Sequence, residues 1–160
     1  MSQVGSFGVN YKKDFGLDPA VIEFRLGDVA SNRLGSFVYI KAASAIDQYA
    51  FVTIDESGNA AMLTTTNAGT GEGTVGVVQV ALAANEFGFA WIGGAAGGGG
   101  VIKGKVAASY AANAALYTTA TAGVADDAAT TLIKNVVGLT TDSGSGSAVA
   151  LYSSNFLTVK

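Results

Sequence analysis

The chain has 160 residues, a length that suits one ordinary domain burying about two-thirds of its unfolded surface. Nine basic and twelve acidic residues give a formal net charge of −3, which argues against a nucleic-acid partner because nucleic acids select strongly basic surfaces. Only 13% of the residues are charged and 49% are hydrophobic. Either alanine accounts for much of this apolar content, or other subunits cover part of the surface.

The sequence contains no cysteine and no histidine, and their absence excludes several kinds of chemistry. Disulfides, thiol nucleophiles, zinc sites built from Cys and His, and a histidine general base are all ruled out. The N-terminus has no apolar stretch typical of a secretory signal, and no apolar run is long enough to cross a membrane. We therefore expect no enzymatic activity, no cofactor, no metal site and no membrane association.

Residues 1–19 differ from the rest of the chain. Glycines interrupt any periodicity there, three aromatic residues recur at every fourth position, and Pro19 closes the segment. The segment is either a frayed terminus or an extended arm that docks its aromatic side chains on a partner. Three large aromatic residues are many for a solvated tail, which favours the arm. The candidate contact residues are Phe7, Tyr11, Lys12, Lys13 and Phe15.

From residue 20 onward, short apolar runs alternate with turn residues, a pattern typical of a β-sandwich or barrel. In the run 87–92, three aromatic residues alternate with small or aliphatic ones, so the aromatic side chains share one face of a strand. The predicted strands are 21–26, 37–41, 49–54, 60–65, 75–82, 87–92, 102–106, 116–121, 132–140 and 147–153. We predict a mainly β, antiparallel sandwich or barrel-like domain over residues 20–160, with at most one short helix, in the alanine-rich segment 106–116.

The two halves of this domain echo each other in sequence. Residues 41–60 align with 106–125 at an offset of 65 (106 − 41), and Val75 aligns with Val137 at an offset of 62 (137 − 75). Chance matching among abundant Ala, Gly and Thr is the alternative explanation. A true repeat would mean two similar β units joined by a flexible block of six glycines and two alanines. The predicted units are residues 20–92 and 101–160, and the joint is 93–100.

Two glycine-rich motifs resemble nucleotide-binding loops without meeting their requirements. Residues 99–105 match seven positions of a phosphate-binding loop, but Val106 stands where a magnesium-binding Ser or Thr is needed. Residues 71–76 match GxGxxG, but a strand rather than a helix follows them. We expect the first motif to be part of a strand and the second to be a turn.

Charged residues also have ordinary explanations. Asp55-Glu56 and Asp126-Asp127 are the adjacent acidic pairs, and both are expected in solvated turns. Lys103 and Lys105 share one face of the predicted strand 102–106, where lysines protect a solvated sheet edge or meet an acidic partner. Neither pattern forms a catalytic or metal-binding set.

The second half of the chain also follows a recognisable order of segments. In sequence they are Val75-Gly76, Phe87–Gly93, Leu116–Thr119, Ala122-Gly123, Val136-Val137-Gly138 and Val149–Leu151. In this order and composition the second half resembles the small decoration, or cement, proteins that coat the capsids of tailed bacteriophages. Residues 1–30 match no part of that pattern.

This resemblance implies a β-rich structural virion protein on the outer surface of the capsid, where it bridges neighbouring subunits of the major capsid protein. It also implies a homo-oligomer, with a trimer favoured and a dimer as the alternative. The arm of residues 1–19 would then add a strand to a sheet edge of the shell. The other hypothesis is a carbohydrate- or surface-binding β module of a phage fibre or spike. Its stacking platforms would be Phe87, Phe89, Trp91 and tyrosine residues, although alternating aromatic residues more often face a core.

Overall fold

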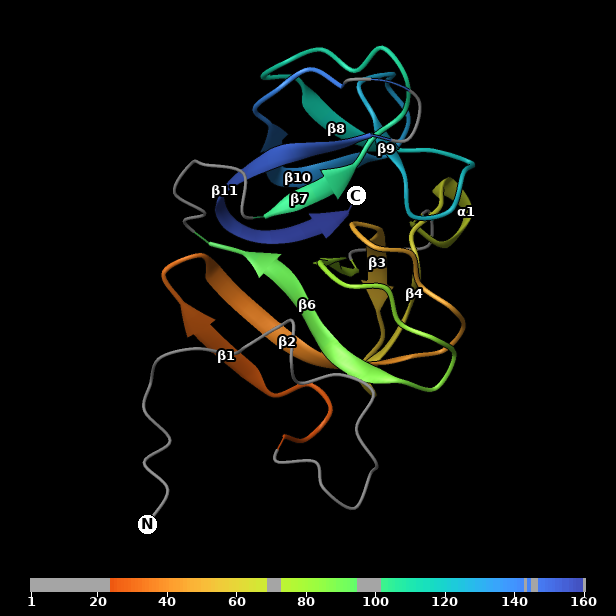
Figure 1. Cartoon of the computed structure of the whole chain (residues 1–160), viewed down its shortest axis with the longest axis vertical. Helices are drawn as coiled ribbons and strands as arrows, with labels where there is room; N and C mark the ends of the chain where they lie inside the picture. The colour runs from red at the N-terminus through yellow and green to blue at the C-terminus, as the bar shows by residue number, and fades with distance from the viewer. Residues whose placement is uncertain (1–23, 69–72, 95–101, 143, 145–146, 160) are drawn as a thin grey trace.

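The structure is a computed structural model with a mainly β fold, as predicted (Figure 1). The described residues are 24–68, 73–94, 102–142, 144 and 147–159. One helix is present among them, the four-residue α1 (Thr65–Ala68). The strands are β1 (Val29–Asn32), β2 (Gly35–Ala42), β3 (Phe51–Ile54), β4 (Asn59–Met62), β5 (Thr74–Val78), β6 (Phe87–Gly93), β7 (Lys103–Lys105), β8 (Ala115–Thr118), β9 (Ala125–Asp126), β10 (Leu132–Gly138) and β11 (Ala148–Val159).

Strands β2 to β6 close into a small barrel, which we call the first barrel. Strand β2 pairs in parallel with β4, and antiparallel pairs continue the ring through β3, β5 and β6 back to β2. Because side chains alternate along a strand, every second residue points into the barrel. The buried interior residues include Val38, Ile40, Ala42, Val52, Ala60, Val78, Ala90 and Ile92.

Strands β7 to β11 repeat this pairing scheme and form the second barrel. Antiparallel pairs join β7 to β11, β11 to β10, β10 to β8 and β8 to β9. A parallel bridge between Val106 and Ala125 then closes the ring at the end of β7. In each barrel, therefore, the first strand pairs in parallel with the third and every other pair is antiparallel. Figure 1 shows the two barrels one above the other.

Strand pairing gives slightly different offsets between the halves from those of the sequence alignment. Lys41 pairs with Phe87 in the first barrel, and Lys105 pairs with Ala148 in the second barrel. These two equivalent pairs give offsets of 64 (105 − 41) and 61 (148 − 87). Phe51 faces Val77 and Ala115 faces Val137, so the partner of Val137 in the first barrel is Val77, at an offset of 60 (137 − 77), rather than Val75. The offset falls from 64 to 60 because the connection from the third to the fourth strand is shorter in the second barrel, residues 127–131, than in the first, residues 63–73, which contain α1.

Strand β11 is the element that belongs to both barrels. Inside the second barrel its first half pairs with β7 and β10, and its end pairs with β10 again at Thr158 and Val159. Phe156 also pairs with Gly93 of β6, and Thr158 with Thr74 of β5. The strand was predicted to end at residue 153 but runs on to Val159. This extension carries Leu157 into the apolar layer between the barrels.

Several predicted elements differ in the structure. Residues 24–26 of the predicted strand 21–26 are not a strand, residues 21–23 lie outside the described part, and the first strand starts at Val29. Strands β4 and β5 end at Met62 and Val78, earlier than predicted, and β3 starts at Phe51 because Tyr49 has a φ of 64°.

The helix predicted in residues 106–116 is absent, and that prediction was wrong. Ser109 and Asn113 have φ values of 69° and 60°, a left-handed backbone that interrupts a right-handed helix. The helix forms at α1 instead. There Thr64 caps the first turn, since its Oγ1 accepts a hydrogen bond from the Asn67 amide at 3.2 Å while its own amide donates to Asn67 Oδ1 at 2.6 Å.

Candidate interaction surfaces

The predicted contact residues of the N-terminal arm, Phe7, Tyr11, Lys12, Lys13 and Phe15, lie outside the described residues. The described chain starts at Phe24, which is half-buried on the outer face of the first barrel. Its ring lies 5.6 Å from that of Tyr39 and 5.1 Å, edge to face, from that of Phe89. The described chain therefore begins at this face.

Strand β1 follows directly and forms a hairpin with β2. Among the described strands it pairs with β2 alone, so its other edge faces away from the barrel. The Tyr39 amide donates to the Asp28 carbonyl at 2.9 Å, so the Asp28 carbonyl points toward β2. Backbone groups of successive residues point to opposite sides of a strand, and the amide and carbonyl of Val29 therefore point toward the open edge. The Val29 side chain is 55% exposed. Sequence reasoning missed this edge because it placed the strand too early in the chain.

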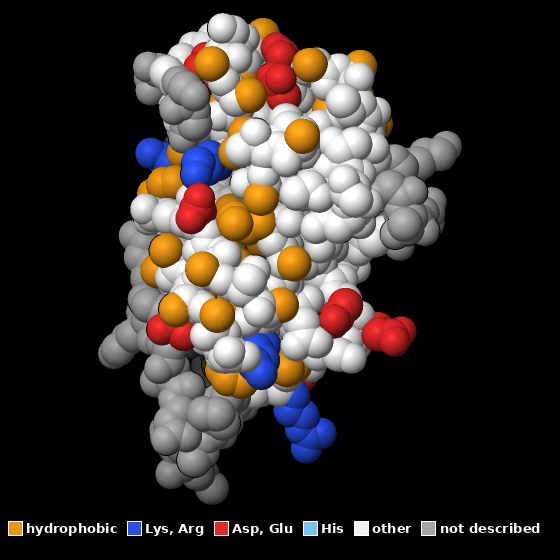
Figure 2. All heavy atoms as spheres, turned by 90° about the vertical axis from the view of Figure 1, so that its right-hand side faces the viewer, with side chains coloured by type: hydrophobic (Ala, Val, Ile, Leu, Met, Phe, Trp, Pro, Cys, Tyr) orange, Lys and Arg blue, Asp and Glu red, His pale blue; other side chains and the backbone are white. Residues whose placement is uncertain are grey.

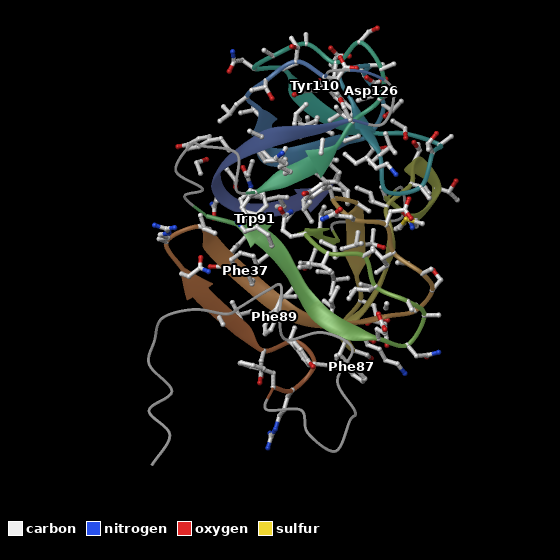
Figure 3. All side chains as sticks on the ribbon, viewed as in Figure 1. Phe37, Phe87, Phe89, Trp91, Tyr110 and Asp126 are labelled. Carbon is white, nitrogen blue, oxygen red and sulfur yellow. The ribbon has the colours of Figure 1, made fainter. Side chains whose placement is uncertain are left out.

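The aromatic residues of β6 belong to the core. Phe89 is 3% exposed and Trp91 is 0% exposed, and the Trp91 indole Nε1 donates to the Leu34 carbonyl at 2.9 Å. Phe87 is half-buried, and its ring stacks on Tyr39 at 6.0 Å. Figure 3 shows the three side chains following β6 toward the junction of the barrels. The expectation that alternating aromatic residues face a core is confirmed for Phe89 and Trp91, and this pair offers no exposed stacking platform.

The two glycine-rich motifs fold as strands where they are described. Lys103–Lys105 is strand β7, and residues 99–101 lie outside the described part. The second motif was expected to be a turn, but Gly73 leads directly into β5, so residues 74–76 of the motif lie in a strand and that expectation was wrong for them. Gly104 packs closely against Phe51, because a Cβ added to it would lie 2.7 Å from the Phe51 ring. This leaves no space for a ligand at Gly104.

The acidic pairs have structural roles. Asp55 holds its turn together, because one carboxylate oxygen accepts hydrogen bonds from the amides of Ser57 and Asn59. A bond from the Asn59 side chain, followed by these backbone bonds, lowers the pKa of Asp55. Asp126 was expected in a turn but lies in β9 opposite Tyr117, and Asp127 accepts from the Ala111 amide. Within the described ranges, no three His, Cys, Asp or Glu side chains gather as a metal site would require.

The predicted lysine-protected edge is not a solvated edge, and that expectation was wrong. The amide of Lys105 donates to the Tyr49 carbonyl at 2.8 Å, so β7 is bonded to the first barrel. Lys105 forms a 3.0 Å ion pair with Asp47, and the Lys103 ammonium lies 6.0 Å from the centre of the Tyr49 ring. Both lysines therefore face the loop 47–49 of the first barrel.

Gln79 adds the central polar contact between the barrels. Its side chain is 3% exposed, its Nε2 donates to the Lys103 carbonyl at 2.8 Å, and its Oε1 accepts from the Lys103 amide at 3.0 Å. The amide group thus takes the place of a neighbouring strand. Because both backbone groups of Lys103 depend on it, Gln79 fixes the position of β7.

An apolar hollow of about 450 Å³ lies on the outer surface of the second barrel. Its lining residues are Ala115, Leu132, Ile133, Lys134, Asn135, Val136, Val137, Tyr152 and Ser154. Tyr152 is 43% exposed, and the nearby Phe156, whose carbonyl accepts from the Asn135 side chain at 2.8 Å, is 51% exposed. Figure 2 shows one face of the molecule, on which acidic and basic side chains lie in small separate groups.

Comparisons of the chain with known protein families, with curated proteins and with solved structures find no match. Among the described residues, no helix is both long and apolar enough to cross a membrane.

Proposed function

We propose that this protein is a structural virion protein that decorates the outside of a tailed-phage capsid and stabilises it by bridging neighbouring subunits of the major capsid protein. The observation that carries the proposal is the open edge of β1, which continues directly from the aromatic N-terminal segment. A strand of the shell protein pairing with this edge would gain backbone hydrogen bonds without any titratable site.

The two-barrel body supports the same role. Both barrels close on themselves, and the shared strand β11 and the Gln79 contact hold them together. A rigid body of this kind transmits load between the subunits that it touches. Many copies acting together make weak individual contacts sufficient for a stable shell. Self-association of the copies belongs to this proposal.

The alternative, a carbohydrate-binding module of a fibre or spike, depends on exposed aromatic platforms. Phe89 and Trp91 are buried, so the strand that suggested this function contributes to the core instead. Tyr152 on β11 is 43% exposed and remains available as a stacking platform, so glycan binding stays the second candidate function.

Co-sedimentation with undecorated phage heads tests the proposal. We expect deletion of residues 1–19 to reduce binding strongly. We expect Val29→Pro to reduce binding as well, because it removes the outward-facing backbone donor of β1, whereas Val29→Thr keeps that donor and serves as the matched control. If both the deletion and Val29→Pro bind heads as the wild type does, the edge of β1 is not the shell contact and the proposal loses its support.

A further inference from the structure

A row of three side chains crosses the outer face of the first barrel and is completely covered. Phe51 faces Val77 and Val77 faces Trp91 on the neighbouring strands β3, β5 and β6. Each of the three is 0% exposed. The second barrel provides much of the cover. The Phe51 ring lies against Gly104 of β7, and the row shares one apolar cluster with Leu157 of β11.

The second barrel carries the same row at the same positions, but nothing in the described chain covers it. Ala115 faces Val137 and Val137 faces Tyr152 on β8, β10 and β11. Ala115 and Val137 are half-buried, and Tyr152 is 43% exposed. All three line the hollow of about 450 Å³. The face that is covered on the first barrel is therefore exposed on the second barrel.

Another copy cannot close this face in the way that the second barrel closes the first. That contact uses the turn at Gly123, whose carbonyl accepts from the Phe51 amide at 3.0 Å. The corresponding turn of the first barrel, at Gly58, is already occupied. A Cβ added to Gly58 would lie 2.8 Å from the Cβ of Leu26 and 3.1 Å from the amide nitrogen of Gly27. A head-to-tail chain of copies is therefore blocked by the residues that precede β1.

The same face on a second copy does offer a complementary surface. It combines a hollow with two projecting aromatic side chains, Tyr152 and Phe156, and Lys134 is the one charged residue in the lining. A twofold axis brings the projecting rings of each copy over the hollow of the other, which is the geometry of an isologous contact. Aromatic side chains supply the large apolar area on which such contacts depend.

We propose that two copies of this chain associate about a twofold axis through the hollow of the second barrel, with Tyr152 and Phe156 of each copy in the hollow of the other. The contact is separate from the shell binding proposed for the edge of β1. It rests on the self-association included in the proposed function and names the surface that carries it. An isologous contact is complete in a pair, so it predicts a dimer in solution rather than the trimer that the resemblance implies.

Light scattering after size-exclusion chromatography measures the mass of the full chain directly. We expect a dimer for the wild type and a monomer for Ala115→Arg, which places a long cationic side chain in the hollow. The matched control is Ala45→Arg, the same substitution at an exposed alanine of the first barrel, and it should remain a dimer. Trp91, the one tryptophan, reports through its fluorescence whether each variant is folded.

Two further measurements keep the test decisive if Ala115→Arg fails to fold. Tyr152→Ser truncates an exposed side chain, and we expect it to raise the dimer dissociation constant about tenfold or more. The chain has no cysteine, so Tyr152→Cys introduces a single thiol that a short bismaleimide should link between copies, whereas Ala45→Cys should not be linked.

A monomeric or trimeric wild type would overturn the proposal, and so would a dimer that the substitutions at Ala115 and Tyr152 leave unchanged. Loss of the dimer after deletion of residues 1–19 alone would assign the contact to the arm. Loss of head binding by Ala115→Arg with the dimer intact would assign the hollow to the shell protein. Dimer loss with normal head binding is the expected result, and it leaves the shell proposal standing.

Discussion

Replacing Gln79 by methionine tests whether one buried amide holds the two barrels together. Methionine nearly matches the length and volume of glutamine but neither donates to the Lys103 carbonyl nor accepts from the Lys103 amide. A buried backbone group left without a partner costs about 1–3 kcal/mol. Two such groups would cost about 2–6 kcal/mol at full burial. Because Lys103 is only half-buried, we expect the lower part of this range, about 2–3 kcal/mol.

The assay is urea unfolding followed by Trp91 fluorescence, with the midpoint and slope fitted for each variant. Gln48→Met is the matched control. The Gln48 side chain is exposed and donates to the Gln79 carbonyl at 3.1 Å, a bond that water replaces. We expect this control to lie within about 0.5 kcal/mol of the wild type.

A third variant separates hydrogen bonding from packing. Gln79→Glu places a carboxylate opposite the Lys103 carbonyl at neutral pH, which repels it, whereas the protonated acid donates to that carbonyl in acid. Relative to wild type, the Glu variant should therefore recover stability as the pH falls, and the Met variant should not. A loss below about 0.5 kcal/mol for Gln79→Met, or equal losses for the two Met variants, would show that the amide does not join the barrels.

Two other substitutions test the packing and the polar contacts of the second barrel. Gly104→Ala should destabilise by about 1–3 kcal/mol in urea unfolding, because the new methyl group meets the Phe51 ring, while Gly73→Ala, with its nearest neighbour at 3.8 Å, should change stability by less than 1 kcal/mol. Equal effects would contradict the tight contact. Tyr110→Phe should cost about 1–3 kcal/mol because the buried Gly138 amide, 3.0 Å from the Tyr110 hydroxyl, loses its acceptor. Burial raises the pKa of Tyr110, so the folded state favours the neutral phenol. The stability of the wild type should therefore fall as the pH rises above about 10, and it should fall more steeply than that of the Phe variant. Parallel pH profiles of the two proteins would argue against this role.

The class of fold was predictable because periodicity depends on short stretches of sequence. Alternation in the run 87–92 placed its aromatic residues on one face, and the structure buries two of them almost completely. The limits of strands were less predictable because they depend on distant partners. Strand β11 runs past residue 153 because Phe156 and Thr158 find partners on β6 and β5, and because Thr158 and Val159 pair with β10 as well.

The failed helix shows how turns override composition. Alanines in 106–116 favour a helix by intrinsic propensity, but the segment spans the end of the second barrel. Tyr110 in its middle is buried over Gly138, where an added Cβ would lie 2.7 Å from the tyrosine ring. Ser109 and Asn113 take left-handed backbone conformations that bring Tyr110 there. Such tertiary demands are not visible in local sequence.

The candidate interaction surfaces were only partly predictable from the sequence. The arm was proposed from its aromatic residues, which lie outside the described part of the chain. The hollow escaped sequence reasoning because its residues come from three strands, and Ala115, Val137 and Tyr152 become neighbours only through pairing. The repeat in the sequence did not point to it, because the sequence alignment pairs Ala115 with Ala50 and Val137 with Val75, whereas strand pairing makes Phe51 and Val77 their counterparts.

The double membership of β11 has a consequence for biosynthesis. The ribosome releases the N-terminal barrel long before residues 156–159 exist, and Phe51, Val77 and Trp91 need those residues and β7 for their cover. The nascent chain therefore carries an unshielded apolar stripe until residues 156–159 are made, and the closure joins segments that are far apart in sequence. Slow closure of this kind favours binding by holdase chaperones and makes chains that lack these residues prone to aggregate. Loss of residues 156–159 would thus affect the yield of folded protein.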